Sequence, residues 1–196
     1  MIGEITPLVQ RAGRRIWIMV VAWHIAGATL SAALLGLVLS TCGLVFGVSG
    51  WKLPLGVVVG GAMFFCALRD MDIGRWPLPS LRRQTPAWLP RVFGNRWGVF
   101  TWGADLGQGW TTYVSFAGYY GLVLWAFVAG QPAQAVMILG SYGAGRALPV
   151  LVAGFVGHDY TLARAHQAHM YMLHAVNAIA LAVVAGYLLS RGIRIA

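Results

Sequence analysis

Hydrophobic residues along this chain occur in long runs that are separated by short polar stretches. The runs cover residues 16–46, 53–68, 97–129, 133–156 and 168–189. A helix needs about 20 predominantly apolar residues to cross the hydrocarbon core of a bilayer. The pattern therefore predicts an all-α integral membrane protein, a five-span helical bundle that forms a single transmembrane domain over residues 1–196.

The stretch at residues 69–96 is the longest polar segment between the runs, and it is rich in arginine. Its charged residues are Arg69, Asp70, Asp72, Arg75, Arg82, Arg83, Arg91 and Arg96. Basic loops of membrane proteins are retained on the cytoplasmic side. We therefore predict that this loop and the N-terminus lie inside, that the C-terminus lies outside, and that the protein is a multi-pass protein of the cell inner (plasma) membrane.

Composition supports a membrane protein over a soluble domain. Hydrophobic residues make up 59% of the chain and charged residues 10%, whereas soluble domains contain about 25% charged residues. The net charge is +9, but the arginines lie between apolar runs, where they suit anionic lipid headgroups. The expected partners are the lipid bilayer and other membrane-protein subunits, and not nucleic acid.

Two opposite charges interrupt the third and fourth predicted spans. Asp105 lies in the inner part of one span, and Arg146 lies at a compatible depth in the next. A charge within hydrocarbon costs at least a few kcal/mol, so such residues usually face a partner or a cavity. We expect a direct or water-mediated ion pair, which either fixes the helix register or forms a gate or an anion site.

Histidines offer a second kind of chemistry. His24 and His174 lie within predicted spans, where imidazole could ligate a metal ion or a tetrapyrrole. The alternative is that they are ordinary interfacial or packed histidines. The sequence contains no complete metal-ligand signature and no nucleophile–base, phosphate-loop or paired-carboxylate pattern. It therefore predicts a protein that is not an enzyme, and it identifies no cofactor.

A motif in the middle of the chain resembles the CcdA/DsbD transmembrane family. That family carries a segment of the form G-x-x-x-G-x-x-W-T-P-C, followed by a helix that ends in Y-x-x-G-x-x-x-P. The corresponding residues here are Gly103, Gly107, Trp110, Thr111, Thr112, Tyr113, Tyr142, Gly145 and Pro149. The resemblance implies a membrane scaffold related to proteins of cytochrome c biogenesis, which transfer electrons by thiol–disulfide exchange.

The cysteines depart from that family. Tyr113 stands where the family has its second redox cysteine, and Cys42 and Cys66 fall at different depths of antiparallel spans. Their expected separation in depth, roughly 15–20 Å, is too large for a disulfide. The leading expectation is a non-enzymatic, thiol-less scaffold that serves as an accessory subunit of a larger electron-transfer or pigment-bearing membrane assembly. The alternatives are a small-solute or metal-ion transporter that uses Asp105 and Arg146, and a redox carrier with thiols supplied by a partner.

Overall fold

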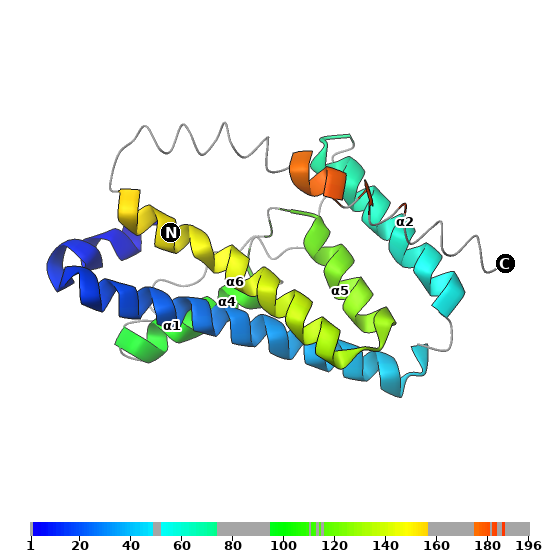
Figure 1. Cartoon of the computed structure of the whole chain (residues 1–196), viewed down its shortest axis with the longest axis horizontal. Helices are drawn as coiled ribbons and strands as arrows, with labels where there is room; N and C mark the ends of the chain where they lie inside the picture. The colour runs from blue at the N-terminus through cyan, green and yellow to red at the C-terminus, as the bar shows by residue number, and fades with distance from the viewer. Residues whose placement is uncertain are drawn as a thin grey trace. The chain divides into compact units, whose positions relative to one another are not determined.

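In the part of the chain that it describes, the computed structural model has helices as its regular secondary structure (Figure 1). It describes residues 2–48, 52–73, 95–109, 111–112, 114, 116–156, 175–180, 182–183 and 186. The helices are α1 (Ile2–Val45), α2 (Lys52–Asp70), α4 (Asn95–Gln108), α5 (Gly118–Ala129) and α6 (Pro132–Val156). A further helical segment covers residues 175–180.

The end of α2 is closed by a Schellman motif. The N–H of Ile73 donates to the carbonyl of Leu68 at 2.9 Å, and the N–H of Asp72 donates to the carbonyl of Arg69 at 2.9 Å. Asp72 accordingly has φ of +62°. Glycine is the usual residue at this position because a side chain disfavours the left-handed backbone conformation. Asp72 therefore adopts a conformation that glycine would adopt more readily.

Glycines in the left-handed backbone conformation follow the ends of three other helices. Gly109 and Gly130, with φ values of 74° and 57°, directly follow the last residues of α4 and α5. Gly47, with φ of 64°, comes two residues after the end of α1. Pro132 is the first residue of α6, a position where its missing N–H has no helical partner to lose. Gly109 explains why α4 ends within the apolar run at 97–129, which is divided into two short helices.

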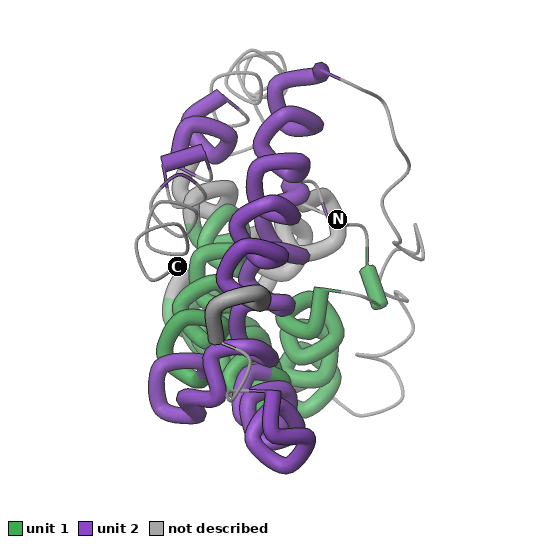
Figure 2. Tube along the Cα trace, turned by 90° about the vertical axis from the view of Figure 1, so that its right-hand side faces the viewer, with its two compact units in different colours: residues 1–35, 80–113, 136–160 green, residues 36–79, 114–135, 161–196 purple. Residues whose placement is uncertain are grey.

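The chain forms two compact units (Figure 2). Unit 1 comprises Met1–Leu35, Ser80–Tyr113 and Val136–Tyr160, and unit 2 comprises Gly36–Pro79, Val114–Ala135 and Thr161–Ala196. Each unit therefore combines segments that are far apart in the sequence.

Glycines allow the helices of unit 1 to approach at the level of their backbones. A methyl group built on Gly103 of α4 would overlap the carbonyl oxygen of His24 in α1, and one on Gly107 would overlap that of Ala28. On α1, a methyl group at Gly27 would overlap the carbonyl oxygen of Phe100. A methyl group on Gly143 of α6 would also overlap the Ala28 carbonyl oxygen. Small residues permit this close helix packing, as in the G-x-x-x-G motif.

Unit 2 is built around the packing of α2 on α5. Val59, Met63 and Ala67 of α2 form a buried cluster with Ala178 of the 175–180 segment. Leu124, Trp125 and Val128 of α5 pack against this cluster. The backbones of α1 and α5 also lie close together in unit 2, because a methyl group on Gly43 of α1 would overlap the carbonyl oxygen of Phe127.

The predicted five-span membrane bundle, with the orientation derived from it, is wrong. Among the described residues, one helix is long and apolar enough to cross a membrane, Arg15–Val45 within α1. The apolar run at 97–129 instead forms α4 and α5, of 14 and 12 residues, which are shorter than the ~20 residues of a spanning helix. Most of the predicted loop at 69–96 and of the predicted span at 168–189 lies outside the described residues.

Candidate functional site

A polar cluster among the described residues of unit 1 surrounds the C-terminus of α4. Arg146 of α6 donates through Nη1 to the carbonyl of Leu106 at 3.0 Å and through Nη2 to the hydroxyl of Thr112 at 3.1 Å. The last carbonyls of a helix lack helical donors and carry a partial negative charge. The guanidinium therefore satisfies one of these carbonyls and favourably compensates the helix dipole.

Thr111 completes this cluster, because its hydroxyl donates to the backbone carbonyl of Asp105 at 2.8 Å. Two successive carbonyls of α4, those of Asp105 and Leu106, thus receive side-chain donors. The structure brings Asp105 and Arg146 to the same helix end. The guanidinium of Arg146 bonds there to a main-chain and a hydroxyl oxygen, and direct pairing of the two charges stays a prediction.

The remaining positions of the sequence motif fall on different elements. Tyr142, Gly145 and Pro149 lie within α6, and Pro149 is inside the helix, where it cannot donate to the Gly145 carbonyl. Gly103 and Gly107 serve the close packing of α4 on α1. Trp110 and Tyr113 lie outside the described residues.

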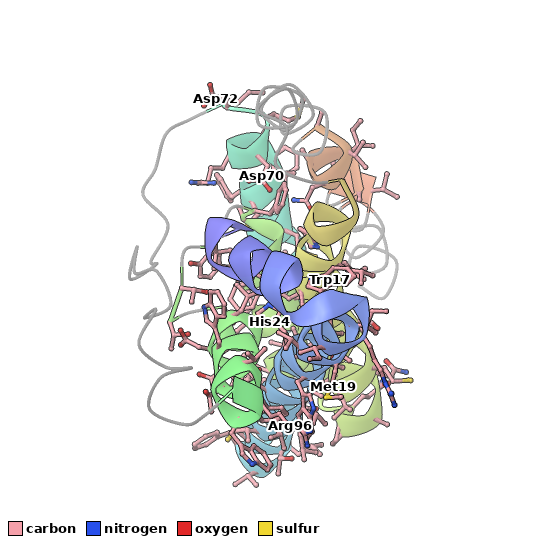
Figure 3. All side chains as sticks on the ribbon, turned by 90° about the vertical axis from the view of Figure 1, so that its left-hand side faces the viewer. Trp17, Met19, His24, Asp70, Asp72 and Arg96 are labelled. Atoms are coloured by element: carbon pink, nitrogen blue, oxygen red, sulfur yellow. The ribbon has the colours of Figure 1, made fainter. Side chains whose placement is uncertain are left out.

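His24 lies on α1 in the interior of unit 1 (Figure 3). Its side chain is fully buried, and neither ring nitrogen has a hydrogen-bond partner within the described parts of the chain. The imidazole packs nearly edge-on against Trp102, with the ring centroids 5.7 Å apart. The described residues contain no group of three or more histidine, cysteine or acidic side chains that could hold a metal ion. His174, the other predicted ligand, lies outside them.

Asp70 forms a second polar cluster, in unit 2, that sequence reasoning did not identify. Its carboxylate accepts the N–H of Ala117 at 3.0 and 3.1 Å and the Asn177 amide at 2.6 Å. Arg69 lies 3.4 Å from the same carboxylate. Asp70 follows the apolar run of α2 directly, and the hydropathy pattern therefore assigns it to the polar loop at 69–96. Its partners are 47 and 107 residues away in the sequence, and no local pattern indicates them.

The cysteines do not form a disulfide, because Cys42 and Cys66 are both free. Burial raises the pKa of the Cys66 thiol, and the nearby Asp70 carboxylate raises it further. The thiolate is the reactive form of cysteine. A raised thiol pKa makes Cys66 a poor nucleophile near neutral pH.

Comparison with known proteins gives two similar sequences of the same name. The chain is 33% identical over 145 residues to the methylamine utilization protein MauF of Paracoccus denitrificans, a match that covers 74% of this chain and 52% of that protein. It is 31% identical over 151 residues to MauF of Paracoccus versutus, covering 74% of this chain and 54% of the relative. The chain thus spans about half the length of the curated relatives it matches. No family model matches the sequence, and no solved structure gives a significant match.

These comparisons overturn the predicted resemblance to the CcdA/DsbD family. The significant relatives carry the name MauF, and none of the findings indicates CcdA, DsbD or cytochrome c biogenesis. The expected thiol-less scaffold in an electron-transfer or pigment-bearing assembly, the transporter and the redox carrier are likewise unsupported. The physical reason is that the motif consists of residues common in closely packed helices, and Gly103 and Gly107 are accounted for by contact with the α1 backbone.

Proposed function

We propose that this protein is an accessory protein of methylamine utilisation. The observation that carries the proposal is the 33% identity over 145 residues to a protein with the name methylamine utilization protein MauF. The match covers 52% of that relative. The proposal therefore concerns the role in methylamine utilisation of the 145 residues that the two proteins share.

The proposed role is non-enzymatic. The two polar clusters of the described residues engage their side chains in contacts between helices. Arg146 bonds to the end of α4, and Asp70 holds the start of α5 and Asn177. A catalytic site instead needs a nucleophile or base aimed at a space that a substrate can enter. These contacts give both clusters a structural role, which supports an accessory protein over one that converts methylamine itself.

The proposed location is the inner (plasma) membrane, with the lipid bilayer and other membrane proteins as partners and no role for nucleic acid. The apolar stretch Arg15–Val45 of α1 supports membrane attachment by length and composition. Trp17, Val21 and His24 of this helix are buried within unit 1. A cleaved signal sequence would remove them from the folded protein, so we propose that α1 is retained as an anchor.

Deletion of the protein in its own organism tests the proposed function. We expect growth on methylamine to be lost and growth on succinate with ammonium to be retained. Re-expression of the full chain should restore growth on methylamine. Unchanged growth of the deletion strain on methylamine as the sole carbon and nitrogen source would refute the proposal.

A matched pair of variants connects this phenotype to the fold. Gly103→Ala introduces a methyl group against the α1 backbone, whereas Gly145→Ala introduces one into open space. Gly145→Ala should restore growth of the deletion strain, and Gly103→Ala should fail to do so.

A further inference from the structure

The exposed side of α1 is almost entirely apolar, and the buried side includes polar residues, unlike in a helix that faces water. His24 and Ser40 are fully buried and Ser31 is 9% exposed, whereas Leu34 is 60% and Val38 is 56% exposed. Folding in water buries apolar side chains, because their exposure to water is unfavourable. A helix that exposes many large apolar side chains is stable where the surroundings are themselves apolar.

The inward residues of α1 are held by contacts within each unit, and in unit 2 Gly43 lies against the backbone of Phe127 in α5. Ser31 donates to the carbonyl of Ala104 in α4 at 2.7 Å, and Gly27 and Ala28 lie against the backbones of α4 and α6. These contacts determine which side of α1 faces the protein. The opposite side is therefore defined by the fold and not only by hydropathy.

The outward side of α1 is wide and long. Its exposed apolar side chains include Leu30, Leu34, Leu37, Val38, Leu44 and Val45. No aspartate, glutamate, lysine or arginine occurs between Arg15 and Lys52. At about 100° per residue, the exposed positions of α1 cover roughly half of its circumference, whereas one packed helix would cover a stripe about 100° wide. Acyl chains can cover the whole of such a surface.

We propose that the outward side of α1 faces lipid acyl chains while its inward side faces α4 and α6 in unit 1 and α5 in unit 2. The inference deepens the proposed membrane attachment and rests on it. The 31 residues from Arg15 to Val45 extend about 46 Å, longer than the ~30 Å hydrocarbon core. The lipid contact is therefore centred near Leu30 and Leu34, and the ends of this stretch lie in the headgroup regions.

Spin labelling of the full chain in phosphatidylcholine–phosphatidylglycerol vesicles tests this arrangement. Cys42 and Cys66 are first replaced by serine, and single cysteines are then introduced at Ile16, Leu30, Leu34, Val38 and Val45. The collision rates of each label with molecular oxygen and with a water-soluble nickel chelate are compared. A label at Gln131, which is exposed in the turn before α6, provides the matched control.

The expected ratio of oxygen to nickel collisions is several-fold higher at Leu30 and Leu34 than at Gln131, and it falls towards Ile16 and Val45. Dominant nickel collisions at Leu34 and Val38 would show that this side faces water. Low collision rates with both reagents would show that a second copy of the chain covers it. Either result overturns the proposal, and neither changes the outcome of the growth test, so failure of this inference is distinguishable from failure of the proposed function.

Discussion

The Asp70 carboxylate receives the backbone N–H of Ala117 with both of its oxygens, at 3.0 and 3.1 Å. Ala117 is the residue before α5 and offers no side-chain cap of its own. A negative charge at the N-terminus of a helix is favourable because the first N–H groups are unsatisfied and carry partial positive charge. Asp70 thus caps α5 from another helix and fixes α2 to it.

Removal of this cap should destabilise unit 2. In Asp70→Ala, the buried Ala117 N–H and the Asn177 amide lose an acceptor, so we expect the free energy of unfolding to fall by about 1–3 kcal/mol. The measurement is reversible unfolding of the purified protein in detergent. Asp72→Asn is the matched control, because it removes a nearby charge and retains a side chain that tolerates positive φ. An equal effect of both substitutions would contradict the capping role.

Asp72 itself offers a stabilising substitution. Its φ of +62° suits glycine better than any residue with a side chain, so Asp72→Gly should relieve backbone strain. The greater freedom of glycine in the unfolded chain offsets part of the gain, and the expected net increase in unfolding free energy is about 0.5–1 kcal/mol. Asp72→Val should have the opposite effect. The prediction fails if the glycine variant unfolds more easily than the parent.

The Arg146 cluster should show measurable coupling to Thr112. Arg146→Met removes the two guanidinium hydrogen bonds, and its expected cost is about 1.5–3 kcal/mol of unfolding free energy because the donor is charged. Thr112→Val removes the hydroxyl and should cost less. A double-mutant cycle should show that the two effects are not additive. Asp105→Asn, combined with Arg146→Met in a second cycle, tests the predicted ion pair, and strictly additive effects would reject it.

The glycines of unit 1 should tolerate a methyl group according to the space beside them. Gly103→Ala and Gly107→Ala place a Cβ against backbone oxygens of α1, which cannot move without separating the helices. We expect a loss of about 1–3 kcal/mol or more in stability. Gly145→Ala meets no atom within 4 Å and should stabilise α6 by up to about 1 kcal/mol. Similar losses in all three variants would contradict the close helix crossing.

Cys66 should be alkylated slowly near neutral pH. Burial, followed by the Asp70 charge, raises its thiol pKa, so less thiolate is present at a given pH than in a small thiol. In a Cys42→Ala variant, the rate of iodoacetamide reaction should rise with pH and reach its midpoint above that of a short cysteine peptide measured in parallel. A midpoint at or below that of the peptide would contradict the assignment.

Several features could be predicted from the sequence because they depend on neighbouring residues. Long apolar runs determined that the chain is helical, and Gly130 and Pro132 marked the turn between α5 and α6. The number of spanning helices could not be predicted in this way. Hydropathy averages over the run at 97–129, and only the glycine-rich stretch around Asp105, which ends with Gly109, indicates the interruption after Gln108.

The sequence by itself determined the helical class, the apolar character and the presence of charges within apolar stretches, because these depend on composition and local spacing. Only the tertiary structure decided what those charges contact: Arg146 bonds the end of α4, and Asp70 bonds Ala117 and Asn177. It also decided which side of α1 is buried. The physical reason is that these partners lie on helices far apart in the chain, and only the backbone approach permitted by Gly27, Gly103 and Gly107 brings the unit 1 helices together.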